Sequence, residues 1–257
     1  MSPEPARQVE YLSAVSPVSM GDEWFEIASL SHFWIKRRFE VLRKLAPRPS
    51  WTDVAVAEVG CGTGLIQRQM EDAFGITVDG FDLNVQALRQ NVSRASRVCC
   101  YNIFDRRLEL QGRYDVILLC DVLEHIDDTT SFLDAVAFHL KEKGRLLVNV
   151  PADQSLYSSY DRAVGHIRRY SIAELRDVLA EARFQSNNWT YWGLPLIPLL
   201  HIRKWLLQRQ SDEVEIMRSG FKPPSSVGNS LLGQLSRIEI LPQRWKGASL
   251  MAVAEKV

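Results

Sequence analysis

The sequence has no excess of either charge and no long apolar segment. Its 257 residues include 31 Lys and Arg against 31 Asp and Glu, so the formal net charge is zero. Nucleic-acid binding requires a positive surface, and this balance indicates none. An apolar stretch at residues 194–207 is interrupted by two prolines and by basic side chains, which makes it too short and too charged to span a bilayer. The composition therefore predicts a globular chain with no nucleic-acid partner.

Cysteine is also scarce. The four cysteines, Cys61, Cys99, Cys100 and Cys120, lie in predicted strands or in a glycine turn, and none has the spacing with histidines that zinc ligands show. We expect small buried thiols in a reducing compartment. Residues 1–5 provide neither the basic start nor the apolar run of a secretory signal, so the expected location is the cytoplasm.

The most informative stretch is a run of alanine and β-branched residues that stops at three glycines, within residues 54–66. It predicts a buried parallel strand, a tight turn and the start of a helix. Gly60, Gly62 and Gly64 allow positive φ and let a ligand approach the backbone. The dinucleotide fingerprint G-x-G-x-x-G is not met, because the residue three after Gly62 is Leu65. The stretch therefore predicts a cradle for another kind of ligand.

Glu58 and the three glycines match the E-x-G-x-G-x-G first motif of class I S-adenosylmethionine-dependent methyltransferases, which this stretch resembles. In that family the acid contacts the methionyl ammonium group of the cofactor, and the turn packs beneath its methionine and ribose. The resemblance implies S-adenosylmethionine as the cofactor. The cofactor residues that we predict are Glu58, Gly60, Cys61, Gly62, Gly64, Asp82, Leu83, Asn102, Ile103, Phe104, Asp105 and Cys120.

Two acids in this set follow predicted strands. Asp82 ends a short strand at residues 76–82, and an acid at the tip of the second strand of a doubly wound sheet is placed to accept hydrogen bonds from both ribose hydroxyls. The alternative for Asp82 is a surface acid that caps the next helix. The resemblance places Asp105 beside the adenine amino group, with Ile103 or Phe104 against the ring; the alternative is a turn aspartate.

The fourth predicted strand, residues 114–120, leads into a second informative segment. Its V-L-E-H run resembles small-molecule methyltransferases, including the ubiquinone-pathway O-methyltransferases. His125 is a candidate base or orienting donor, and a structural histidine is the alternative. Asp127 and Asp128 suggest a metal pair, but capping of the next helix explains them more simply, so we predict no metal. The N-P-P-Y signature of nucleobase methyltransferases is absent, which argues against DNA methylation.

A loop at residues 152–170 follows the fifth predicted strand and concentrates polar and aromatic side chains. Such loops hold substrate contacts. His166 is our preferred base, with a structural role as the alternative. Ser171 and Glu174 predict a capping box that starts the next helix. The string D-x-x-x-G-H-x-R-R-Y-S resembles a bacterial methyltransferase subgroup that acts largely in glycan and lipid-linked pathways. The predicted substrate residues are Tyr157, Tyr160, Asp161, Arg168, Arg169 and Tyr170.

The predicted fold is α/β, a doubly wound Rossmann-like sheet of seven strands whose last strand, residues 248–254, is antiparallel. We predict an N-terminal arm and helical cap at residues 1–49, with a helix at 22–45 whose basic face is solvated. The methyltransferase domain spans residues 50–257 with an insertion at about 194–247. Within the insertion, 194–207 is a candidate membrane contact, substrate cover or homodimer contact, and 208–229 is expected to be a loop.

The predicted function is methyl transfer from S-adenosylmethionine to a hydroxyl group of a sugar, a lipid-linked glycan or a small metabolite. Methylation of an amine or a protein lysine is the alternative within the same class. A cofactor-binding scaffold without catalysis is the alternative of another class. The sequence does not identify the acceptor.

Overall fold

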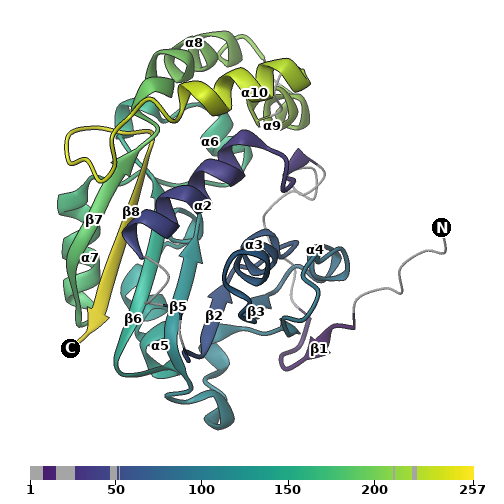
Figure 1. Cartoon of the computed structure of the whole chain (residues 1–257), viewed down its shortest axis with the longest axis vertical. Helices are drawn as coiled ribbons and strands as arrows, with labels where there is room; N and C mark the ends of the chain where they lie inside the picture. Colours follow the sequence, from purple (N-terminus) through teal and green to yellow (C-terminus); the bar gives the residue numbers. More distant parts are fainter. Residues whose placement is uncertain (1–7, 16–26, 47–50, 52, 211, 222–224) are drawn as a thin grey trace.

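The computed structural model describes residues 8–15, 27–46, 51, 53–210, 212–221 and 225–257, which form one mixed sheet with helices on both faces (Figure 1). The strands are β1 (Glu10–Tyr11), β2 (Val56–Val59), β3 (Asp79–Asp82), β4 (Val98–Cys100), β5 (Tyr114–Cys120), β6 (Leu140–Pro151), β7 (Phe184–Trp192) and β8 (Ser249–Lys256). The helices are α2 (Phe33–Leu45), α3 (Leu65–Phe74), α4 (Val85–Arg89), α5 (Thr129–His139), α6 (Ser159–Ala163), α7 (Ile172–Glu181), α8 (Ile197–Leu207), α9 (Glu213–Phe221) and α10 (Ser226–Leu235).

The strand order is β1-β4-β3-β2-β5-β6-β8-β7. Strand β8 runs antiparallel to both of its neighbours, β6 and β7, which confirms the predicted antiparallel last strand. The predicted count of seven strands is wrong by one, because β1 pairs in parallel with β4 at the edge of the sheet. Glu10 in β1 also forms an ion pair with Arg97 at 2.7 Å. A strand of two residues is too short to produce a periodic pattern, so the sequence did not reveal it.

Alternate residues of the central strands pack on opposite faces of the sheet. In β5, Ile117 and Leu119 belong to the core shared with α5 and α7, whereas Val116 and Leu118 belong to the core shared with α2 and α3. This follows from the two-residue repeat of a strand. Because both faces are covered, most residues of β5 are apolar, and the local pattern predicted this strand at its observed bounds. The four cysteines are buried free thiols, as predicted.

Helix α2 begins at Phe33, and His32 caps it by accepting a hydrogen bond from the Trp34 N–H. The predicted start at residue 22 lies outside the described residues. The expectation that the basic side chains of this helix are solvated is wrong for Arg37 and Arg38, which are buried. Both are paired with acids distant in the sequence, which removes most of the cost of burying a charge.

The expectation of a loop at residues 208–229 is wrong, because α9 and the start of α10 lie there. Helices α8, α9 and α10 gather at one end of the molecule, next to α2 and α6 (Figure 1). Ile216 and Met217 of α9 are buried against Tyr160 of α6, and the Asn229 side chain of α10 accepts a hydrogen bond from the Phe33 N–H. These contacts with distant segments stabilise helices whose local sequence contains many loop-forming residues. Within the described residues, no helix is both long and apolar enough to cross a membrane.

Candidate active site

A cavity of about 570 Å³ lies between the carboxyl ends of the parallel strands and the helices of the insertion. Ligands of open parallel sheets bind at this edge. Most of the predicted cofactor residues line the cavity: Glu58, Gly60, Cys61, Gly62, Asp82, Leu83, Asn102, Ile103, Phe104 and Cys120. The insertion contributes the apolar side chains of Leu196, Leu199, Leu200, Met217, Phe221 and Leu232. The cavity therefore has a polar floor at the sheet edge and an apolar cover.

The glycine turn between β2 and α3 requires glycine for conformation and for space. Gly60 and Gly64 have φ of +77° and +73°. A Cβ atom on Gly60 would lie 2.6 Å from Cγ2 of Val122, and one on Gly64 would collide with the Asn91 side chain. Gly64 itself is not among the cavity residues and serves as the N-cap of α3. The turn therefore keeps its shape because side chains pack against the places where Cβ atoms would be.

Glu58 is a buried acid at the floor of the cavity. Its Oε2 atom has no hydrogen-bond partner among the described residues. Burial raises the pKa of Glu58 to about 8, although the nearby Arg38 guanidinium acts in the opposite direction. An unpartnered carboxyl oxygen facing a cavity fits a ligand that carries a positive charge, such as the ammonium group of an amino acid.

Asp82 lies at the tip of β3, where backbone groups hold its carboxylate. The Gly62 N–H donates to Oδ2 at 2.7 Å and the Asn84 N–H donates to Oδ1 at 2.8 Å. Burial raises the pKa of Asp82, and these N–H groups act against that rise. The helix-cap alternative for Asp82 is wrong, because the Asn84 side chain caps α4 by accepting from the Ala87 N–H. Asp82 is left as an oriented acceptor beside the glycine turn.

Asp105 was predicted to contact the cofactor, but it does not line the cavity. It is exposed, it is not among the cavity residues, and its Oδ2 atom accepts a hydrogen bond from the Ser13 hydroxyl. Its contact with adenine stays a prediction. Asn102, Ile103 and Phe104 in the same segment do line the cavity.

On the acceptor side, the structure brings His125, His166, Tyr160 and Arg169 together at the cavity. The remaining predicted substrate residues are not among the cavity residues: Tyr157, Asp161, Arg168 and Tyr170. Three of these hold the loop in place through hydrogen bonds to backbone carbonyls: Tyr157 to His166, Arg168 to Asp127, and Tyr170 to Leu123. These hydrogen bonds position the loop, although the three side chains do not line the cavity. The Ser171–Glu174 capping box is present at the start of α7, as predicted.

Asp161 organises this loop from a fully buried position. Its Oδ1 atom accepts from Nδ1 of His166 at 3.1 Å and from Nε of Arg169 at 2.8 Å, and its Oδ2 atom accepts from the Ser158 N–H at 2.9 Å. Burial acts to raise the pKa of Asp161, but the hydrogen bond from His166 and the charge of Arg169 lower it to about 2. Asp161 is therefore a carboxylate that fixes the orientation of the His166 ring.

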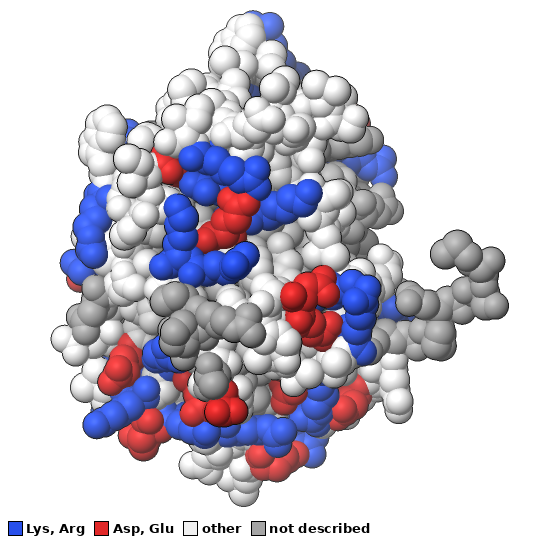
Figure 2. Space-filling model, viewed as in Figure 1, with Lys and Arg blue, Asp and Glu red and all other residues white. Residues whose placement is uncertain are grey.

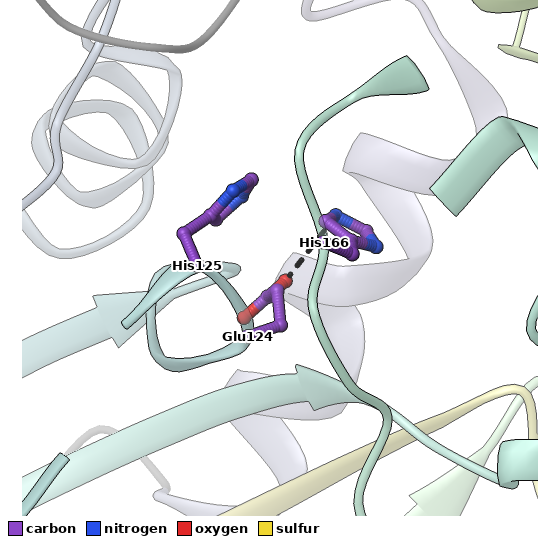
Figure 3. A group of neighbouring side chains, drawn as sticks. All are labelled: Glu124, His125 and His166. Atoms are coloured by element: carbon purple, nitrogen blue, oxygen red, sulfur yellow. Dashed lines mark ion pairs between the residues drawn. The ribbon is translucent and has the colours of Figure 1, made fainter. Parts of the chain in front are cut away.

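His125 and Glu124 lie beside His166 (Figure 3). Nδ1 of His125 is 3.1 Å from the Gly165 carbonyl oxygen, and the two histidine rings meet edge to face with centroids 4.9 Å apart. Burial lowers the pKa of His125 to about 4, and His166 adds to this effect. Glu124 is fully buried beneath the rings, and burial raises the pKa of its carboxyl group.

Arg38 and Asp121 form an ion pair at the cavity, and neither was predicted as a site residue. Arg38 enters the cavity from α2 and donates to Oδ2 of Asp121 at 2.6 Å, and Asn149 donates to Oδ1 of the same acid at 2.7 Å. Asp121 directly follows β5 and has φ of +61°, an unusual conformation for a residue other than glycine. The position of Asp121 directly after a strand could have identified it as a site residue, because ligands bind at the carboxyl ends of parallel strands. Nothing in the local sequence identified Arg38, because its partner lies 83 residues away.

A family profile described as a methyltransferase domain matches residues 30–188, which is more than half of the chain. The chain belongs to this methyltransferase family. The match confirms the resemblance read from Glu58 and the glycines, with S-adenosylmethionine as the family's cofactor. It ends before the insertion that covers the cavity.

Two curated proteins are similar to this chain over part of their length. A ubiquinone biosynthesis O-methyltransferase from Rickettsia bellii is 24% identical over 152 residues, which cover 50% of this chain and 61% of the relative. A probable S-adenosylmethionine-dependent methyltransferase from Mycobacterium tuberculosis is 27% identical over 184 residues, which cover 67% of this chain and 64% of the relative. This chain therefore matches about three fifths of the length of these relatives.

A solved structure gives the same fold. The possible histamine N-methyltransferase from Thermotoga maritima superimposes with a TM-score of 0.57 at 19% identity, and the match covers 88% of this chain and 92% of that one. At this identity the likeness supports the Rossmann-like α/β architecture and no particular acceptor.

Proposed function

We propose that this chain transfers a methyl group from S-adenosylmethionine to a hydroxyl group of a small or lipid-linked acceptor. The observation that carries the proposal is one continuous cavity that joins the glycine turn, Glu58 and Asp82 to His125 and His166. A donor and an acceptor held in one such cavity react without the entropy cost of meeting in solution. The sulfonium of the bound cofactor supplies the methyl group.

The proposed cofactor position follows from the charges at the floor of the cavity. Glu58 would accept from the cofactor's ammonium group, and the Arg38 guanidinium would face its carboxylate. Asp82 would accept from the ribose hydroxyls. Ile103 and Phe104 would line the adenine ring. Each of these residues meets a group of matching charge or polarity.

The proposed acceptor carries its hydroxyl on an apolar body. The insertion covers the cavity with leucine, methionine and phenylalanine side chains, and the acceptor side of the cavity includes the polar side chains of the two histidines. This division suits a hydroxyl that points toward the histidines and a carbon skeleton that contacts the cover. The oxygen-directed name of the Rickettsia bellii relative supports the choice of a hydroxyl over an amine.

Transfer of an isotope-labelled methyl group tests the proposal. The full chain is incubated with labelled S-adenosylmethionine and matched pairs of apolar alcohols and amines, and the products are identified by mass spectrometry. We expect labelled ethers and the demethylated cofactor. Labelled amines alone would support N-methylation. Cofactor binding without product from any acceptor would support the scaffold alternative.

A further inference from the structure

Three side chains that can bind metals converge beside the acceptor end of the cavity, which His125 and His166 line and beneath which Glu124 is buried. Glu124 and His125 belong to a 3₁₀ turn at Leu123–His125, directly after β5, and His166 belongs to the loop between α6 and α7. One ligand atom from each residue lies within 4.8 Å of the other two (Figure 3). The Ile167 N–H donates to the Glu124 carbonyl oxygen at 2.9 Å, which ties the two segments together. This backbone hydrogen bond holds the two segments together, and with them the three side chains.

The carboxyl group of Glu124 indicates that this convergence serves a ligand. Glu124 is 0% exposed, and both of its carboxyl oxygens accept no hydrogen bond from any described residue. Its nearest ionic contact is Nε2 of His166 at 3.7 Å, which is too long for a hydrogen bond. A buried carboxyl group without partners destabilises a fold. A cation held between Glu124 and the histidines would satisfy it.

Each of the two histidine rings has a hydrogen-bond partner at Nδ1. Nδ1 of His125 contacts the Gly165 carbonyl oxygen at 3.1 Å, and because a carbonyl can only accept, Nδ1 carries the proton. Nδ1 of His166 contacts Oδ1 of Asp161 at 3.1 Å, and Arg169 holds that carboxylate. In the neutral form that binds a metal, each ring with its proton on Nδ1 has the unshared electron pair on Nε2. Metal-binding histidines typically hold their other ring N–H in this way, to a carbonyl or a carboxylate.

The neighbouring acids do not belong to the group. Asp121 uses both carboxylate oxygens, one for Arg38 and one for Asn149. Asp128 caps α5 by accepting from the Ser131 N–H at 2.9 Å. The capping role predicted for Asp128 is confirmed. The pair of acids at Asp127 and Asp128 was the metal signal in the sequence, whereas the adjacent Glu124 and His125 gave none.

We propose that Glu124, His125 and His166 bind one divalent first-row transition metal whose remaining coordination positions face the cavity. Two imidazole nitrogens and one carboxylate oxygen suit Zn²⁺, Fe²⁺ or Co²⁺ better than Mg²⁺, which prefers oxygen ligands. This proposal replaces our prediction of no metal.

The role of the metal rests on the proposed function, whereas its binding does not. The metal would polarise the acceptor hydroxyl and favour loss of its proton to solvent. The oxygen–methyl bond would then form as the sulfur–methyl bond of the cofactor breaks, leaving the demethylated cofactor. In this arrangement the histidines hold the metal ion as ligands, the metal supplies the positive charge, and neither histidine acts as the base.

Metal titration of the untagged full chain tests the site directly. After chelation and dialysis, Zn²⁺ binding is measured by calorimetry, and Co²⁺ binding by its visible absorption, which reports nitrogen and oxygen ligands. We expect one metal ion per wild-type chain. Glu124→Gln and His166→Ala should each weaken binding at least 100-fold. Asp128→Asn, a neighbouring acid outside the group, should bind as wild type does.

Cofactor affinity, measured on every variant, shows whether the fold and the cofactor site are intact. Glu124→Gln keeps the size of the side chain, so a folded variant is expected. Absence of stoichiometric metal in the wild type, or equal affinity in the wild type and Glu124→Gln, would overturn the site. Metal binding without methyl transfer to any acceptor would instead contradict the proposed function. An unchanged transfer rate in the metal-free chain would contradict the catalytic role of the metal.

Discussion

At the scale of single residues, Glu58 illustrates how burial prepares a side chain for its ligand. With a pKa raised to about 8, Glu58 is protonated at pH 7 in the free protein. An ammonium group beside it favours the carboxylate, so cofactor binding should release a proton. Affinity should therefore rise with pH from about 6 to about 8, above which the cofactor's own amino group loses its proton.

Calorimetry in two buffers of different ionisation enthalpy measures this proton release. The apparent binding enthalpy at pH 7 should differ between phosphate and Tris for the wild type. It should be the same in both buffers for Glu58→Gln, whose amide cannot titrate. A wild-type enthalpy that is independent of the buffer would show that Glu58 does not change its protonation state on binding.

Asp82 and Asp105 form a matched pair for the ribose and adenine assignments. Asp82→Ala should weaken binding of the cofactor and of its demethylated product by ~1–3 kcal/mol, because charge-assisted hydrogen bonds are lost. Asp105→Ala tests the predicted adenine contact: a similar loss of affinity would support it, and unchanged affinity is expected if Ser13 keeps this side chain outside the cavity. The reverse order of effects, measured by calorimetry, would require a cofactor position different from the one proposed.

The same residues show which parts of a site a sequence reveals. Gly60 and Asp82 were found because a tight turn and a strand tip have local signatures. Arg38 was missed because a basic residue on a helix gives no sign of a distant acid that will pair with it. Glu124 and His125 were noticed as a motif, but their relation to His166 depends on a loop 40 residues further on.

At the scale of elements, a buried ion pair joins α2 to the end of the insertion. Arg37 donates to Oε1 of Glu239 at 3.1 Å, and Glu239 also accepts from the N–H groups of Gly193 and Leu194. Both side chains are almost fully buried, at 4% and 2% exposure. Arg37 also contacts the partly exposed Glu40 at 3.2 Å, so removing Glu239 leaves the buried Arg37 charge only partly compensated. Breaking a buried ion pair typically costs ~3–5 kcal/mol.

We therefore expect Glu239→Ala to lower the free energy of unfolding by ~3–5 kcal/mol in chemical denaturation. Asp134→Ala is the control, because its partner Arg106 and Asp134 itself are both largely exposed. Such surface pairs contribute ~0–1 kcal/mol. Equal effects of the two substitutions would mean that the Glu239 pair is not buried in solution.

Two side chains of helix α8 can distinguish whether the apolar residues of the insertion cover the substrate or contact a membrane. Leu199 lines the cavity, whereas Trp205 is 54% exposed and is not among the cavity residues. The end of the molecule formed by α8 and α10 presents mostly uncharged side chains, while charges of both signs are interspersed over the rest of the same face (Figure 2). This distribution is compatible with a substrate cover and with a membrane contact.

If α8 covers the acceptor, Leu199→Glu should raise KM for apolar acceptors at least tenfold, and Trp205→Glu should leave the kinetics of a water-soluble acceptor unchanged. Liposome flotation then examines the outer face. Loss of lipid recovery in Trp205→Glu alone would add a membrane contact to the cover. Normal KM in Leu199→Glu would contradict the cover.

The elements differ in how well local sequence predicts them. Strand β5 has the predicted boundaries, because its sequence is mostly an apolar run between polar turns. Helix α9 and the start of α10 fall in residues 208–229, which were expected to be a loop because glycine, serine and proline have low helix propensity. They form because contacts with α6 and α2 supply the stability that propensity does not.

At the scale of the whole molecule, the cavity connects parts of the chain that are far apart in sequence. Its floor comes from the ends of the parallel strands, one wall from α2, and its cover from the insertion near the carboxyl end. The insertion also packs on α2 and α6. A ligand in the cavity therefore contacts the sheet and elements that depend on one another for stability, so its binding energy should stabilise the described fold as a unit.

Thermal unfolding tests this coupling. At a cofactor concentration 100 times its Kd, binding should add ~2.7 kcal/mol to the free energy of unfolding. For a chain of this length, that corresponds to a rise in Tm of ~5–10 °C. Because the insertion and α2 share the cavity with the sheet, we expect a single transition that moves as a whole. A biphasic melt with one phase unaffected by the cofactor would show that the insertion unfolds independently, and would remove it from the cofactor-coupled part of the molecule.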